Sequence, residues 1–137
     1  MSDHDHLEEL SDAACLALLR TVPVGRVGIS VDALPVILPV NFVLDDRAVL
    51  FRTVPGTKLH AAMAQVVVAF EADHYDASSH EAWSVLVRGV AEEITDPERR
   101  TEADGLVPRS WAFGEGADHL VRVPITVLSG RRLRSVP

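Results

Sequence analysis

Apolar and polar residues alternate over much of this chain, which is the two-residue period of β-strands rather than the longer period of helices. The clearest two-residue period spans residues 35–44, with Val36, Leu38, Val40, Phe42 and Leu44 on one face and Ile37, Pro39, Asn41 and Val43 on the other. This run predicts a half-buried strand. Similar runs predict strands at 25–30, 48–53, 66–70, 83–93 and 121–127, with a short last strand after Ser129-Gly130.

Helical spacing is confined to a few short segments. Residues 7–20 have apolar side chains three to four positions apart, Ser11 or Asp12 can cap the helix, and Pro23 prevents its continuation. Residues 57–65 have helix composition, and Asp96-Pro97 is typical of a helix start. Residues 1–6 are expected to form a disordered tail and 73–80 a polar loop, whereas 106–117 show no clear period.

Six or seven strands joined mostly by short turns indicate a mainly β protein of the α+β class. We expect an antiparallel β-barrel with a few short flanking helices. At 137 residues, the chain is predicted to form one domain over 1–137.

Composition excludes several classes of protein. The net charge of −7 disfavours nucleic-acid binding, and no apolar run reaches the about 18 residues that a membrane span needs. The polar start of the chain is unlike a signal peptide, and the single cysteine, Cys15, cannot form an intrachain disulfide. A cytoplasmic location is therefore expected. The histidines lack the spacing of a metal site, so none is predicted.

The chemistry of the chain is concentrated in residues 50–59, Leu-Phe-Arg-Thr-Val-Pro-Gly-Thr-Lys-Leu. Arg52 offers a planar fork and Lys58, the only lysine, a point charge, while Thr53 and Thr57 offer hydroxyl groups. Gly56 lets the backbone approach an anion closely, and the start of the following helix has free N–H groups. These features together predict a phosphate-binding turn.

Three motifs in series resemble the pyridoxamine 5'-phosphate oxidase-like flavoproteins. They are Leu-Pro-Val-Asn-Phe at 38–42, Phe-Arg-Thr at 51–53 with Gly-Thr-Lys at 56–58, and Trp-Ser-Val-Leu-Val-Arg-Gly at 83–89. The resemblance covers roughly residues 10–134. It implies the split β-barrel fold, a homodimer with FMN at the subunit interface, and electron or hydride transfer to a small organic substrate.

The resemblance also implies a set of cofactor-binding residues. Thr53 and Lys58 match phosphate-binding positions, with Arg52 and Thr57 beside them. Pro39, Val40 and Asn41 match the strand that edges the isoalloxazine ring, and Trp83 and Ser84 match a strand that reaches the flavin, often from the partner subunit. No catalytic acid or base is predicted.

The chain departs from the oxidase pattern at two of these motifs. It has Gly-Thr-Lys at 56–58 where the oxidase has Ser-Arg-Lys, and Trp83-Ser84 where the oxidase has Arg-Gln. Arg131, Arg132 and Arg134 fit the oxidase's substrate-phosphate pattern poorly. A substrate other than the vitamin B6 vitamer is therefore expected.

Three alternatives stay open. The barrel could bind the deazaflavin F420 instead of FMN, or it could be a non-enzymatic flavin or haem binder, with His60 or His119 as the haem ligand. It could also be a structural barrel without a cofactor. Trp111 and Phe113 could cover a flavin, although simple packing explains them as well.

Overall fold

The structure is a computed structural model that describes residues 5–53, 64–108 and 119–135. Its strands are β1 (Asp5–Glu9), β2 (Val24–Val31), β3 (Leu34–Asp45), β4 (Ala48–Thr53), β5 (Val67–Asp76), β6 (Glu81–Val90), β7 (Glu92–Glu93), β8 (His119–Pro124) and β9 (Val127–Ser135). The helices are α1 (Asp12–Leu19) and α3 (Pro97–Leu106). The mainly β, antiparallel class is confirmed, with nine strands in the described residues instead of six or seven.

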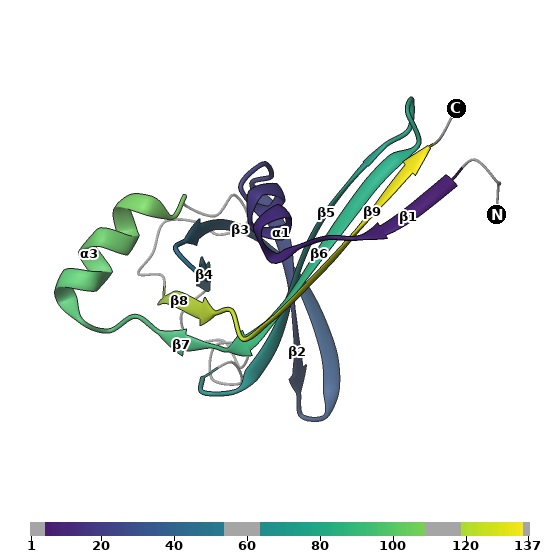
Figure 1. The fold of residues 1–137 in the computed structure, drawn as a ribbon. Helices are drawn as coiled ribbons and strands as arrows, with labels where there is room; N and C mark the ends of the chain where they lie inside the picture. Colours follow the sequence, from purple (N-terminus) through teal and green to yellow (C-terminus); the bar gives the residue numbers. More distant parts are fainter. Residues whose placement is uncertain (1–4, 54–63, 109–118, 136–137) are drawn as a thin grey trace.

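The strands form one continuous antiparallel order, β1-β9-β6-β5-β2-β3-β4-β8-β7. In Figure 1, β5, β6, β9 and β1 run side by side away from the rest of the molecule, and α3 lies at the opposite end. Near its end, β6 approaches β8 so closely that a Cβ on Gly89 would lie 2.1 Å from the Pro124 carbonyl oxygen. Glycine at position 89 therefore lets the two ends of the barrel meet.

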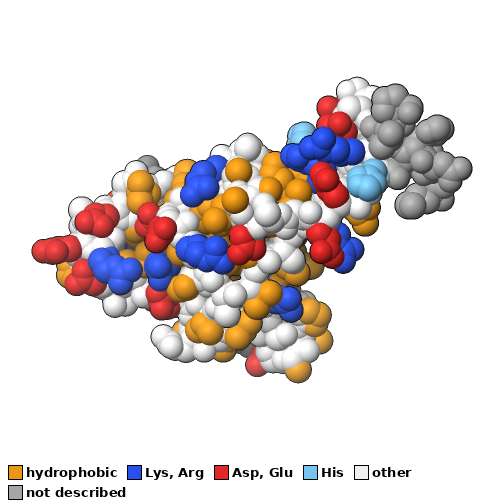
Figure 2. Space-filling view, in the orientation of Figure 1, with side chains coloured by type: hydrophobic (Ala, Val, Ile, Leu, Met, Phe, Trp, Pro, Cys, Tyr) orange, Lys and Arg blue, Asp and Glu red, His pale blue; other side chains and the backbone are white. Residues whose placement is uncertain are grey.

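The main core lies inside this barrel and is closed by α1. Phe51, Phe70, Val85 and Val87 are fully buried, as is Cys15 of α1. A second, smaller core under α3 consists of Leu50, Ile94, Ala103, Val107 and Leu120. On the surface seen in Figure 2, acidic and basic side chains are interspersed with hydrophobic ones.

Helix α1 defines two faces of the sheet. A Cβ on Gly130 would lie 2.6 Å from the Cys15 sulfur, so α1 packs on the face of β9 to which residue 130 belongs. Gly130 is opposite Val85 in the register, and both belong to the inner face. We call the opposite side of β1, β9, β6, β5, β2 and β3 the outer face.

The start of the chain differs from the helix expected over 7–20. Residues Asp5–Glu9 form β1, which pairs with β9, and the helix begins only at Asp12. Ser11 is its N-cap, with a hydroxyl oxygen that accepts a 3.2 Å hydrogen bond from the Ala14 N–H. The expected disordered tail is wrong for Asp5 and His6, because the exposed edge of β9 offers backbone partners that local periodicity does not reveal.

Two other segments also differ from expectation. Residues 73–76 continue β5 and pair with 81–84 of β6, so the predicted loop is reduced to the tight end of a long hairpin. The strand predicted over 121–127 is two strands, β8 and β9, separated at Ile125-Thr126.

The predicted start of α3 is confirmed, with Asp96 as N-cap and Pro97 in the first turn. Most of the helix predicted over 57–65 lies outside the described residues, as does 109–117. No helix in the described ranges is long and apolar enough to cross a membrane.

Candidate functional site

Strand β4 carries two predicted site residues, Arg52 and Thr53, whose side chains lie on opposite faces of the sheet. Successive side chains of a strand point to opposite faces. Thr53 therefore shares the inner face with Phe51, and its side chain is buried. Arg52 shares the other face with Leu50, which packs beneath α3.

The guanidinium of Arg52 binds the C-terminal end of α3. Its Nη2 donates to the carbonyl oxygens of Val107 at 2.8 Å and Asp104 at 3.1 Å, and its Nη1 to the Asp104 carboxylate at 2.9 Å. Its Nε donates to the carbonyl oxygen of Pro108 at 3.3 Å. The last carbonyls of a helix need such partners. These contacts favour a structural role for Arg52 over the direct phosphate contact expected from the sequence, which stays a prediction.

Strand β3 likewise splits its three predicted residues between two faces. Val40 is buried in the main core, whereas Pro39 and Asn41 are on the outer face, opposite Arg26 and Val24 of β2. The side-chain nitrogen of Asn41 donates to the Pro23 carbonyl oxygen at 3.4 Å. Its side-chain oxygen is buried and has no hydrogen-bond partner among the described residues. A buried acceptor without a donor is costly, so this atom is a marked candidate for ligand contact.

Strand β6 presents Trp83 to the core and Ser84 to the outer face. Trp83 packs against the main core, while Ser84 is exposed and lies opposite Arg131 of β9. A cavity of about 430 Å³ runs along this part of the sheet, and it is lined by Leu7, Asp73, His74, Tyr75, Ala82, Trp83, Ser84, Arg131 and Leu133.

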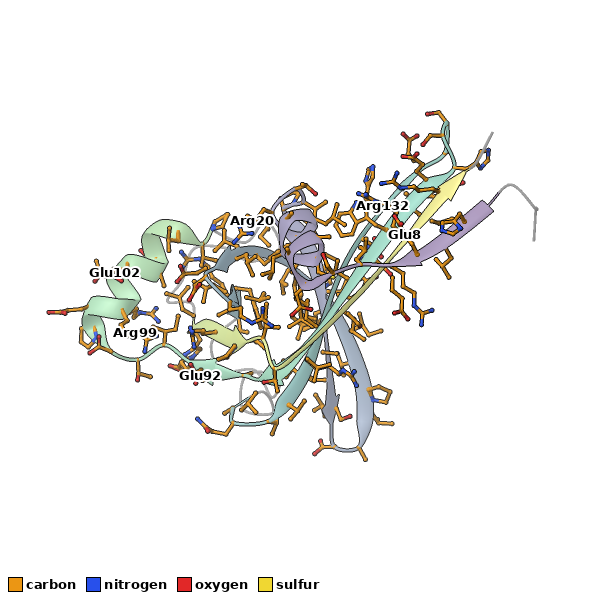
Figure 3. The ribbon with its side chains drawn as sticks, viewed as in Figure 1. Glu8, Arg20, Glu92, Arg99, Glu102 and Arg132 are labelled. Carbon is orange, nitrogen blue, oxygen red and sulfur yellow. The ribbon has the colours of Figure 1, made fainter. Side chains whose placement is uncertain are left out.

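Arg132 follows Arg131 in β9 and occupies the other face. It lies opposite Glu8 of β1, and Figure 3 shows both side chains where the two strands extend beyond α1. Of the three arginines weighed for the substrate phosphate, only Arg131 lines the cavity.

The predicted residues that the structure describes are spread over three strands, β3, β4 and β6. Strands β3, β2 and β5 lie between β4 and β6, and each step across a sheet is about 4.8 Å. Thr53 and Ser84 are thus about 19 Å apart along the sheet. Thr57 and Lys58 lie outside the described residues, as do His60, Trp111 and Phe113.

His119, one of the two histidines considered as a haem ligand, pairs with an acid. Its Nδ1 lies 3.1 Å from a carboxylate oxygen of Glu93 on the neighbouring strand β7. That partner orients the imidazole within the sheet.

The outer face also carries a cluster of three charged side chains, Arg26, Glu71 and Asp73, that the sequence did not indicate. Arg26 lies 3.3 Å from a carboxylate oxygen of Glu71 and 3.5 Å from one of Asp73. Partial burial and, secondarily, the adjacent Asp73 raise the pKa of Glu71 to about 7, against the opposing effect of Arg26. The two-residue spacing of the acids was the available signal, but placing residue 73 in a loop concealed it.

The sequence profile of the pyridoxamine 5'-phosphate oxidase family matches residues 11–132 of the chain. This chain belongs to that family. A protein of Mycobacterium tuberculosis is 35% identical over 130 residues, which cover 91% of this chain and 84% of the relative. The likeness between these two proteins therefore extends well beyond the three short motifs.

Solved structures of the same fold include flavoproteins. The FAD-binding protein of Mycobacterium smegmatis is 41% identical, with a TM-score of 0.77, over 92% of this chain and 97% of that one. An FAD-binding protein from Mesorhizobium loti matches with a TM-score of 0.79 over 96% of this chain and 99% of that one. At 23% identity, the second likeness shows the fold alone.

The described residues fit a flavin in two respects. The unpartnered oxygen of Asn41 can accept a hydrogen bond from a ring N–H, and the adjacent outer face offers Pro39 as an apolar edge. The buried Thr53 comes directly before the predicted phosphate-binding turn.

Proposed function

We propose that this protein binds FMN between two copies of the chain and transfers electrons or hydride to a small organic acceptor. Family membership supports flavin binding. The observation that carries the proposal for this chain is the buried, unpartnered side-chain oxygen of Asn41, on a strand predicted to border the flavin ring.

The phosphate end of the cofactor is assigned to Thr53, Thr57 and Lys58. The support is the chemistry of the turn, in which the only lysine follows a Pro-Gly pair, and the burial of Thr53 where that turn begins. Arg52 holds the end of α3 and thereby fixes the strand end that carries Thr53. Its contribution to phosphate binding is then one of position.

The ring end is assigned to Pro39, Val40 and Asn41 of one chain and to Trp83 and Ser84 of the other. The separation of Thr53 and Ser84 across three intervening strands supports a division between two chains. When bound, the flavin supplies the two-electron chemistry. The chain supplies a hydrogen-bond acceptor at Asn41, an apolar edge at Pro39 and a hydroxyl at Ser84, all on the outer face.

FAD is a second candidate, because the relative from Mycobacterium smegmatis is an FAD-binding protein and 41% identical. FAD contains the FMN unit, so the same residues would hold that half, with the adenylate extending beyond the phosphate site. F420 remains the deazaflavin alternative that the sequence left open.

Titration of the purified chain with FMN, FAD and F420 separately, followed by flavin fluorescence and visible absorbance, tests the proposal. Saturable binding of FMN is expected. Lys58→Ala should weaken it by about 1.5–3 kcal/mol, or about 10- to 150-fold. Arg99→Ala, which removes an exposed charge of α3 outside the proposed site, is the control.

If FAD or F420 binds more tightly than FMN, that molecule and not FMN is assigned as the cofactor. If none of the three binds, the flavin assignment fails. If one binds, reduction by NAD(P)H and reoxidation by candidate acceptors then separate an oxidoreductase from a flavin carrier.

A further inference from the structure

A histidine and a glutamate form a pair at the end of the barrel where β4 finishes. The Nδ1 of His119, the first residue of β8, lies 3.1 Å from a carboxylate oxygen of Glu93 on β7. Their side chains are 31% and 30% exposed, so both are partly shielded from solvent. An ion pair that water still reaches adds little to the stability of a fold. Stability alone is therefore a weak reason for this pair.

Strand register places this pair beside Thr53. His119 is directly opposite Thr53 in the antiparallel pairing of β8 with β4. Glu93 is opposite Val121, which is two residues further along β8 and belongs to the main core. Opposite residues project to the same face, with Cβ atoms about 4.5–5.5 Å apart. The three polar side chains therefore lie on the inner face of β4, β8 and β7, adjacent strands that Figure 1 shows side by side.

The arrangement contains donors that suit a phosphate group. Phosphate oxygens accept their strongest hydrogen bonds from charged donors, and a threonine hydroxyl is a second, neutral donor. A carboxylate at one ring nitrogen of a histidine keeps a proton on that nitrogen and orients the imidazole. The other nitrogen of the protonated ring then donates to an anion. Because opposite Cβ atoms are only about 5 Å apart, one phosphate can contact Thr53 and His119 together.

We infer that His119 is a further phosphate-binding residue of the cofactor site and that Glu93 holds it in position. The Nε2 of His119 donates to the flavin phosphate that Thr53 also contacts, while Glu93 accepts from Nδ1. The inference rests on the proposed function, in which Thr53 belongs to the phosphate end of the cofactor. It adds a residue from β8, a strand that contributes none of the flavin-binding residues predicted from the sequence.

A comparison of FMN with riboflavin isolates the phosphate, because riboflavin has the same ring and ribityl chain and lacks only that group. Fluorescence titration of the full chain gives the two dissociation constants, and their ratio measures what the phosphate contributes to binding. The critical variant is His119→Asn. Its side-chain amide can still donate to Glu93 from the place of Nδ1, but it has no atom in the place of Nε2.

Arg122→Ala is the matched control. Arg122 also joins β8 to β7, through an ion pair of 3.0 Å with Glu92, but on the face opposite to His119. The control therefore removes a charge and a contact between the same two strands away from the proposed phosphate position. His119→Ala, which also loses the contact with Glu93, replaces His119→Asn if circular dichroism shows that the asparagine variant is not folded.

The wild-type chain is expected to bind FMN more tightly than riboflavin, and Arg122→Ala should keep that preference. His119→Asn should reduce the preference at least about fivefold by weakening FMN binding while riboflavin binding stays unchanged. The inference is overturned if His119→Asn keeps the wild-type preference or loses affinity for both flavins equally. Equal binding of both flavins by the wild-type chain would refute the phosphate end together with this inference. A wild-type chain that binds neither flavin would refute the proposed function itself.

Discussion

Replacement of Arg52 by alanine should remove the hydrogen bonds between β4 and the end of α3 and thereby lower the stability of the chain. The side chain is 4% exposed, and its two bonds to the carbonyl oxygens of Val107 and Asp104 are 2.8 and 3.1 Å long. A hydrogen bond to a charged group contributes about 1.5–3 kcal/mol. The Asp104 carboxylate is 55% exposed, so its ion pair adds at most about 1 kcal/mol.

We therefore expect Arg52→Ala to lower the free energy of unfolding by about 3–5 kcal/mol. At this chain length, that corresponds to a fall in Tm of roughly 10–15 °C. Urea unfolding and thermal melts without flavin, at one fixed protein concentration, measure both quantities. Arg52→Lys should lose about half as much, because a single ammonium cannot reach the same carbonyls.

The control is Asp104→Asn, which should cost less than about 1 kcal/mol because it leaves the carbonyl contacts in place. The reasoning is refuted if Arg52→Ala costs less than about 1 kcal/mol without flavin. If its main effect is instead a loss of flavin affinity with unchanged unfolding, Arg52 is a phosphate ligand as the sequence first indicated.

Four further substitutions test other parts of the structure. Gly89→Ala should destabilise the chain by at least about 2 kcal/mol, since its Cβ would lie 2.1 Å from a carbonyl oxygen. Gly105→Ala has open space around it and should stabilise α3 by about 0.5–1 kcal/mol. Urea unfolding of the two variants measures both changes. Ser11→Ala should cost about 1 kcal/mol through loss of the N-cap, and unchanged stability would argue against that cap. Glu71 has a pKa of about 7 in the folded chain and an ordinary value near 4.5 unfolded, so the folded state binds the extra proton between these values. Its contribution to stability is thus present at low pH and lost as pH rises from about 4.5 to 7. Glu71→Gln should flatten that part of the profile, and an identical profile in the variant would contradict the assignment.

The local pattern of the sequence determined several elements directly. The strand over 35–44 was predicted from the sequence, and two side chains of the face that carries Val36 and Leu38, namely Val40 and Phe42, are buried. Asp96-Pro97 defined the start of α3, because a cap and a preset backbone angle act within one turn. The family motifs likewise lie in short segments, so the amino-acid sequence alone carries the resemblance.

Tertiary structure decided what depends on partners distant in the chain. Residues 5–9 form a strand only because β9 offers an edge more than 120 residues away. The sequence placed Arg52 and Thr53 side by side in one phosphate site, but strand alternation sends their side chains to opposite faces, and α3 supplies acceptors for Arg52. The acid pair beside Arg26 likewise exists only because β5 continues past residue 72 and lies against β2. Local periodicity specifies the faces of an element, whereas pairing order specifies what each face meets.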